Sequence, residues 1–129
     1  MRIVVGFAPS PEAHAALARA IEEARLRGAS LLVINASRGD RYTDPSFASE
    51  QDLAGVYREL DLSDVEHEVT QTVRGKDPAE EILEAAAAPE VGLIVIGLRH
   101  RTVAGKFLLG STAQRILLDA PCAVLAVKA

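Results

Sequence analysis

The sequence predicts an α/β fold, a three-layer sandwich built around a five-stranded, mostly parallel sheet. Five short apolar runs of strand length, rich in β-branched residues, alternate along the chain with segments of helical periodicity. Four of these runs are almost continuously apolar, as expected when helices cover both faces of a parallel sheet. Strands and helices that alternate in this way form parallel sheets with right-handed crossovers.

The predicted strands are residues 2–7, 30–36, 65–73, 92–97 and 122–128. The third run, VEHEVTQTV, mixes valine with polar residues. We therefore expect it towards an edge of the sheet, where only part of its surface is covered. The last run, CAVLAVK, is apolar; if it also lies at an edge, its unpaired side needs covering.

Four helices are expected between these strands. Ser10 is placed to cap the first helix, with Pro11 in its first turn and Gly28 at its end. Its apolar stripe consists of small residues, which allows the helix to sit close to the sheet. The second helix spans about residues 48–60, and Gly55 interrupts its pattern.

The third and fourth helices begin with patterns typical of capping boxes. Asp77, Pro78 and Glu80 are expected as the cap, a first-turn residue and the capping-box partner of the third helix. Ser111 and Gln114 have the same spacing at the start of the fourth helix.

Composition and charge restrict the possible functions. The chain has 129 residues, 49% of them hydrophobic, and we expect one domain over residues 1–129. Its formal net charge of −4 argues against nucleic acid or a membrane surface as a partner. The chain has a single cysteine, and its first apolar run is too short for a signal peptide or a membrane span. These observations favour a cytoplasmic protein.

Two predicted loops occupy the place of a ligand site, because ligands of open α/β sheets bind beyond the carboxyl ends of the strands. They are GFAPSPE, residues 6–12, and GLRHRTVAGKFLLGS, residues 97–111. The second loop contains three glycines and four basic residues in an otherwise acidic protein. The free N–H groups and positive dipole end of the helix after it favour an anion such as phosphate. Alternatively, Ser111 caps its own helix and the basic residues form a solvated surface.

The sequence contains no motif typical of catalysis. It lacks the GxxxxGK[ST] phosphate loop, an SGGxDS loop and a HIGH stretch. His14, His67 and His100 have no metal-ligand spacing, and Cys122 is expected as a small core residue. We therefore predict neither an enzyme nor a metal site.

The order of elements, the start IVVG, the Gly-Ser pair before the fourth helix and the close APCAVLAVK resemble the universal stress protein family over the whole chain. The resemblance implies a stress-response role and a Rossmann-like fold similar to that of the adenine nucleotide alpha hydrolases. Nucleotide-binding members carry Gly, two residues, Gly, nine residues and Gly-Ser or Gly-Thr. Gly97, Gly110 and Ser111 keep this spacing, whereas His100 replaces the second glycine. Residues 8–10 read Ala-Pro-Ser where ATP-binding members have Asp-Gly-Ser.

The resemblance therefore implies an altered site for ATP or AMP. It puts adenine beside the backbone near Ile34, and ribose and phosphates near Gly97 and the start of the fourth helix. We expect arginine and histidine cations to replace part of the backbone contacts with phosphate. The expected cofactor-binding residues are Ser10, Ile34, Gly97, Arg99, His100, Gly110, Ser111 and Thr112.

Members of the family commonly dimerise through the last strand, so the resemblance also implies a homodimer. An alternative function follows from the two altered loop positions. In this alternative the chain is a dimeric interaction protein of the same family that binds no nucleotide.

Overall fold

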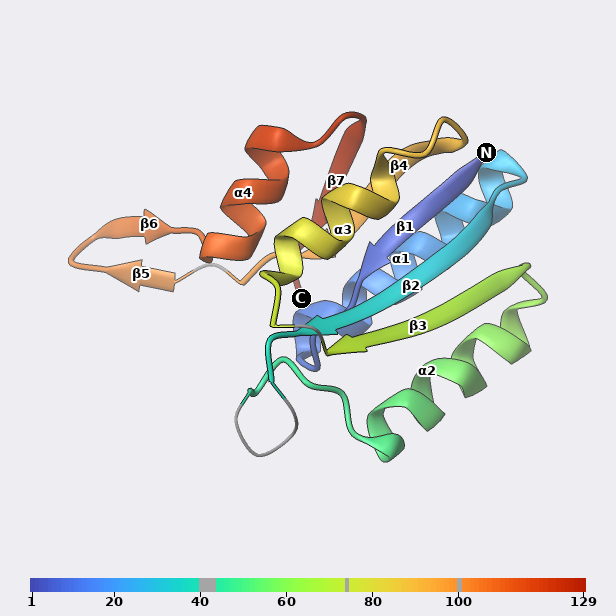
Figure 1. Cartoon of the computed structure of the whole chain (residues 1–129), viewed down its shortest axis with the longest axis horizontal. Coiled ribbons are helices and arrows are strands. Elements are labelled where there is room, and N and C mark those ends of the chain that lie inside the picture. Colours follow the sequence, from blue (N-terminus) through green and yellow to red (C-terminus); the bar gives the residue numbers. More distant parts are fainter. Residues whose placement is uncertain (40–43, 74, 100) are drawn as a thin grey trace.

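The computed structural model describes residues 1–39, 44–73, 75–99 and 101–129 (Figure 1). His100, one of the expected site residues, lies outside these ranges. The elements in chain order are β1 (Arg2–Gly6), α1 (Pro11–Arg27), β2 (Ser30–Ser37), α2 (Glu50–Ser63), β3 (His67–Val73), α3 (Pro78–Ala86), β4 (Val91–Gly97), β5 (Arg101–Val103), β6 (Lys106–Leu108), α4 (Ser111–Asp119) and β7 (Ala123–Val127).

The main sheet has five strands in the order β3-β2-β1-β4-β7, and every pair in it is parallel. Helices α1 and α2 pack on one face and α3 and α4 on the other, so the molecule has three layers (Figure 1). This arrangement confirms the predicted α/β sandwich. Strand β3 lies at one edge, as its mixed composition predicts, and β7 lies at the other.

Each face of the sheet has its own apolar core. Alternate side chains of the central strands point to opposite faces: Ile3 and Val5 of β1 belong to the α1 side, and Val4 belongs to the α3 side. The predicted small-residue stripe of α1 is buried on the first face; it includes Ala13, Ala16, Ala20 and Ala24. Because both faces are covered, the central strands carry apolar side chains on both of their sides.

Helix α2 differs from its prediction at both ends. It starts at Glu50 after a capping box in which Ser49 and Asp52 exchange hydrogen bonds, and it continues to Ser63. Gly55 does not end it. The buried side chains of this helix include Val56 and Leu60, whose packing on the sheet outweighs the low helix propensity of glycine.

Two of the expected helix starts are corrected by the structure. Asp77 caps α3 as predicted, but the Glu80 carboxylate accepts a hydrogen bond from Arg115 (3.2 Å). Helix α4 is capped by Gly110, and Ser111 is its first helical residue. A cap residue needs extended backbone angles, and Gly110 has them (φ −62°, ψ 151°). The prediction that Ser111 caps α4 is therefore wrong.

The long basic loop contains a small antiparallel hairpin that the sequence did not predict. Strands β5 and β6 pair there and project away from the main sheet (Figure 1). Their two-residue turn has positive φ at both Ala104 (51°) and Gly105 (74°). Such turns usually carry Asn-Gly or Asp-Gly, and alanine in the first position gives no such signal. Among the described helices, none has the length and apolar character needed to cross a membrane.

Candidate functional site

A pocket of about 340 Å³ opens at the carboxyl end of the sheet, beside the neighbouring strands β1 and β4. From β1 the chain continues to β2 and β3 on one side of the sheet, and it then crosses to β4 and β7 on the other side. Open α/β sheets bind ligands where the strand order reverses in this way. The described residues that line the pocket are Gly6, Phe7, Ala8, Pro9, Ser10, Glu12, Ala13, Ile34, Ala36, Pro45, Ser46, Pro78, Ile82, Ile96, Gly97, Arg99, Gly110, Thr112, Ala113 and Ile116.

One wall of the pocket is the start of α4. Gly110, Thr112 and Ala113 line it, and no side chain among the described residues caps the helix. A Cβ atom added to Gly110 would meet none of the described atoms within 4 Å, so this position has room for a side chain. The exposed Arg99 guanidinium adds a positive charge to the same pocket. Free N–H groups, the helix dipole and a guanidinium together favour an anion.

A second part of the pocket wall is apolar. It includes Phe7, which follows β1, Ile34 within β2, and Ile82 from α3. The carbonyl of Ile34 already accepts a hydrogen bond from the backbone N–H of Phe7 (2.9 Å). This wall suits the flat apolar face of a ring, whereas the α4 wall suits a charged group.

Gly97 has a packing role that its place in the loop did not reveal. A Cβ atom there would lie 2.6 Å from the backbone C and O atoms of Glu12 and 2.9 Å from the backbone N of Ala13. Real Cβ atoms do not approach backbone so closely, so glycine is required for the first turn of α1 to pack on β4. Gly97 therefore shapes the pocket by letting α1 approach, in addition to lining it.

Asn35 holds residues 46–48 in place, a segment before α2 that contributes Ser46 to the pocket lining. This buried side chain donates from Nδ2 to the carbonyls of Phe7 (2.7 Å) and Ser46 (2.8 Å). Its Oδ1 accepts from the Ala48 N–H (3.0 Å) and from Gln71 Nε2 (2.9 Å). Sequence reasoning missed this residue; its signal is a polar side chain inside the apolar run LLVINA.

Asp44 also holds the backbone of this part of the chain. Its carboxylate accepts hydrogen bonds from the backbone N–H groups of Ser46 (2.9 Å) and Arg38 (2.8 Å). These bonds, that of Ser46 above all, hold the pKa of Asp44 below its ordinary value. The side chain is thus engaged with the backbone of its own loop.

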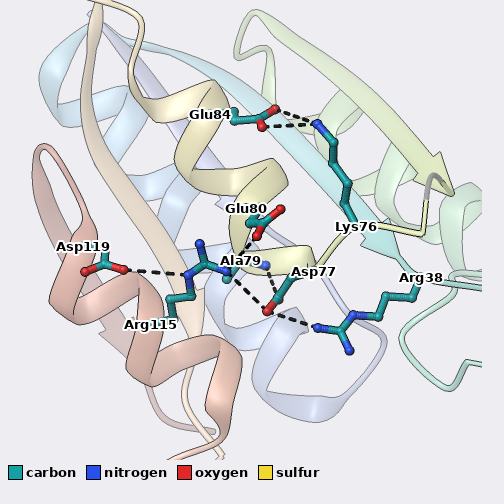
Figure 2. A network of polar contacts seen from close by, with 8 residues as sticks. All are labelled: Arg38, Lys76, Asp77, Ala79, Glu80, Glu84, Arg115 and Asp119. Atoms are coloured by element: carbon teal, nitrogen blue, oxygen red, sulfur yellow. Dashed lines mark hydrogen bonds and ion pairs between the residues drawn. The ribbon is translucent and has the colours of Figure 1, made fainter.

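The start of α3 carries a closed polar network, shown in Figure 2. Asp77 accepts from the Ala79 N–H (3.0 Å) and contacts the guanidinium groups of Arg38 (3.2 Å) and Arg115 (3.5 Å). Arg115 also reaches Glu80 (3.2 Å), and this hydrogen bond, with the nearby carboxylates, raises the pKa of Arg115. The network ties α4 to α3. The carboxylate of Asp77 is already engaged by the Ala79 N–H and by the two guanidinium groups.

Six of the eight expected site residues line the pocket; they are Ser10, Ile34, Gly97, Arg99, Gly110 and Thr112. Ser111 is exposed and is not part of the lining. The Ser10 hydroxyl is already engaged, since it accepts from the Ala13 N–H and donates to the Ala8 carbonyl (both 3.1 Å). Glu12 also lines the pocket, although it was not predicted as a site residue. The available signal was its place in the predicted loop GFAPSPE, residues 6–12.

The remaining candidate residues show ordinary structural surroundings. His14 stacks edge-on against the Phe7 ring, with 5.2 Å between ring centroids. Cys122 packs against the apolar core, and burial raises the pKa of its thiol, which makes it a poor nucleophile. Among the residues that the structure describes, no group of three or more His, Cys, Asp or Glu side chains could hold a metal ion.

A family model described as the universal stress protein family matches residues 1–128. The chain belongs to this family. A universal stress protein of Mycolicibacterium smegmatis is 49% identical over 126 residues, which cover 98% of this chain and 96% of that protein. A solved universal stress protein of Archaeoglobus fulgidus has a TM-score of 0.78 at 32% identity and covers 99% of this chain and 98% of its own. The fold and the resemblance predicted from the sequence are thereby confirmed.

Several structural neighbours carry a nucleotide. One of them is the universal stress protein of Archaeoglobus fulgidus in complex with dAMP, with a TM-score of 0.71 and 28% identity. The match covers 99% of this chain and 98% of that one. A protein of the family with the same fold thus binds a purine nucleotide.

Proposed function

We propose that this chain binds an adenine nucleotide, AMP or ATP, in the pocket beside β1 and β4 and acts in a stress response without catalytic turnover. One observation carries the proposal. Of the four α-helices in the described part of the chain, α1, α2 and α3 begin with a side-chain cap and α4 does not. The uncapped start lines the pocket, so its N–H groups are available to phosphate.

The two walls suggest how the nucleotide lies. Adenine packs against the apolar wall near Ile34, and the phosphate meets the N–H groups after Gly110 together with the Arg99 guanidinium. Ser111 and His100 remain predicted phosphate contacts. The Archaeoglobus fulgidus relative in complex with dAMP supports a nucleotide of this class.

A binding role without turnover is supported by the side chains of the pocket. The described lining contains one carboxylate, Glu12, and no histidine, cysteine or lysine. Hydrolysis of a phosphate ester or anhydride usually needs a positioned base for the attacking water and stabilisation of the leaving group. We therefore expect hydrolysis of bound ATP to be slow or absent.

Titration calorimetry with AMP, ATP, adenosine and inorganic phosphate tests this proposal. We expect heat of binding with AMP or ATP and weaker binding of adenosine, which lacks the phosphate. Absorbance at 260 nm in excess of the protein's own would reveal nucleotide that co-purifies; the chain has no Trp and two Tyr. Folded protein that binds none of the nucleotides at millimolar concentration contradicts the proposal.

A second candidate function is that of a dimeric interaction protein that binds no nucleotide. It is favoured by β7, which lies at the edge of the main sheet and pairs with β4. Residues 124–127 are half-buried, and Leu118 on the preceding helix is 75% exposed. An unpaired apolar edge is usually covered, here by the same strand of a second copy. Light scattering after size-exclusion chromatography tests for a dimer, and the nucleotide titration separates the two functions.

A cytoplasmic location remains a prediction that rests on the composition and the single cysteine.

A further inference from the structure

The amide of Asn35 joins two segments that line the pocket. Its Nδ2 atom donates hydrogen bonds to the carbonyl oxygens of Phe7 (2.7 Å) and Ser46 (2.8 Å), and both of these residues belong to the lining. An amide NH2 group carries two protons, so both donor positions of Asn35 are used. Asn35 itself is buried (1% exposed) and is not among the described lining residues.

The Asn35 amide acts at the apolar part of the pocket wall. Ile34 precedes Asn35 in β2, and the carbonyl of Ile34 accepts a hydrogen bond from the N–H of Phe7 (2.9 Å). Arg99 follows β4, and β1 lies between β2 and β4 in the sheet. The two carbonyls that the amide holds are therefore at the end of the pocket proposed for the base, and β1 separates β2 from the strand that leads to Arg99.

Two further hydrogen bonds fix the orientation of the amide. Its Oδ1 atom accepts from the N–H of Ala48 (3.0 Å) and from Nε2 of Gln71 (2.9 Å). A rotated amide would place its oxygen against the carbonyls of Phe7 and Ser46, which are acceptors as well. Because all four positions of the amide are satisfied, the buried network is rigid and holds the NH2 group against both segments.

The separation of the two segments depends on this amide. Among the residues that the structure describes, no hydrogen bond joins residues 7–10 directly to residues 44–48. The amide nitrogen of Asn35 is the polar link between them. A pocket whose walls are held in place before the ligand arrives loses less free energy to ordering when the ligand binds.

We propose that Asn35 is a positioning residue for the base: by fixing the separation of Phe7 and Ser46, it sets the width of the base-binding end and makes the site prefer a purine to a pyrimidine. This inference rests on the proposed function and deepens it. Asn35 acts through the backbone of the two segments and does not touch the ligand. A purine has a larger flat apolar face than a pyrimidine, so it gains more from walls held at a fixed distance.

The test compares AMP with CMP, which has the same sugar and phosphate, in the wild type and in Asn35→Asp. This variant keeps the shape of the side chain but replaces the donating NH2 group with an oxygen that repels both carbonyls. We expect the wild type to bind AMP about tenfold more tightly than CMP, because adenine buries more apolar area. In Asn35→Asp the preference should fall to about threefold or less, mainly through weaker AMP binding. Displacement calorimetry measures both dissociation constants, and their ratio within each variant does not depend on overall stability.

Asn35→Ala is the second variant, because it removes the amide without burying a charge and so serves where Asn35→Asp fails to fold. Circular dichroism shows which variants are folded. We expect the same loss of preference in Asn35→Ala.

Gln71→Ala is the matched control. Gln71 is exposed on β3 and donates to Oδ1 of Asn35 and to the carbonyl of Ala48 (2.8 Å). Its removal breaks two hydrogen bonds of the same network but leaves those to Phe7 and Ser46, so stability should fall while the tenfold ratio remains. A folded Asn35 variant that keeps this ratio, or a wild type that binds AMP and CMP equally, overturns the role of Asn35. A wild type that binds neither ligand overturns the proposed function itself, which is a different result from binding without discrimination.

Discussion

Helices α3 and α4 both begin at the rim of the pocket, yet only one of these helix starts is closed by the protein's own side chains. At α3, Asp77 caps the helix and also contacts Arg38 and Arg115 (Figure 2). At α4, the corresponding position is Gly110, which has no side chain and, among the described residues, no atom within 4 Å of an added Cβ. Pro78 and Gly110 line the same pocket.

The two helix starts use the same physical feature for two purposes. Every helix start has N–H groups without intrahelical acceptors, and these groups need a partner. A carboxylate cap satisfies them and stabilises the fold, whereas a glycine cap leaves them to solvent or to a ligand. In the same way, the guanidinium groups of Arg38 and Arg115 are paired within the structure, while Arg99 lines the pocket.

The largest effect is expected when α4 is given the cap that α3 has. In Gly110→Asp, the new carboxylate would accept from the first-turn N–H groups and repel phosphate. A like charge at an interface costs several kcal/mol, so we expect AMP to bind about a hundredfold more weakly or worse. Stability should rise by a few tenths of a kcal/mol, since aspartate is a slightly better cap than glycine. Calorimetric titration and urea unfolding measure the two effects.

Gly55→Asp is the control for this change. Gly55 lies on α2, and a Cβ atom added there also meets nothing within 4 Å. The same change of charge at this position should leave AMP affinity unaltered. Equal affinity of Gly110→Asp and the wild type would exclude the start of α4 as the phosphate site.

The two glycines at the ends of the basic loop should differ in how much a side chain there lowers the stability of the fold. Gly97→Ala introduces a Cβ atom 2.6 Å from the Glu12 backbone, so α1 must move away from β4. Overpacking of this kind costs about 1–3 kcal/mol, and we expect the free energy of unfolding to fall by that amount. Chemical denaturation with urea measures it, with Gly110→Ser as the control because Gly110 has room for a side chain. Unchanged stability of Gly97→Ala would contradict the packing role.

The third and smallest effect is expected at α3. Asp77→Ala removes the cap and one partner each of Arg38 and Arg115, and the loss of a cap costs about 1 kcal/mol. Glu84→Ala is the control, because it breaks an exposed ion pair with Lys76 that contributes little. Thermal unfolding compares the two variants. A loss of stability no larger in Asp77→Ala than in Glu84→Ala would show that the network is not structural.

The helix starts also show what local sequence patterns can and cannot predict. Ser10 and Asp77 were predicted as caps and act as caps, because a polar residue before proline at a helix start is a strong local signal. Ser111 was predicted as a cap and is not one, since the helix begins one residue earlier than its pattern indicates. A shift of one residue depends on backbone angles that the sequence pattern does not specify.

By itself the sequence determined the layers of this protein: strands apolar on both faces, helices with one apolar stripe, and a parallel sheet with a mixed-composition strand at its edge. These features follow from periodicity within short segments, so they can be predicted without knowledge of distant contacts. Only the tertiary structure decided how the pocket is built. The approach of Glu12 to Gly97, the four hydrogen bonds of Asn35 and the pairing of Asp77 with Arg38 join segments far apart in the chain. Such contacts depend on how whole elements pack together, and no local pattern encodes them.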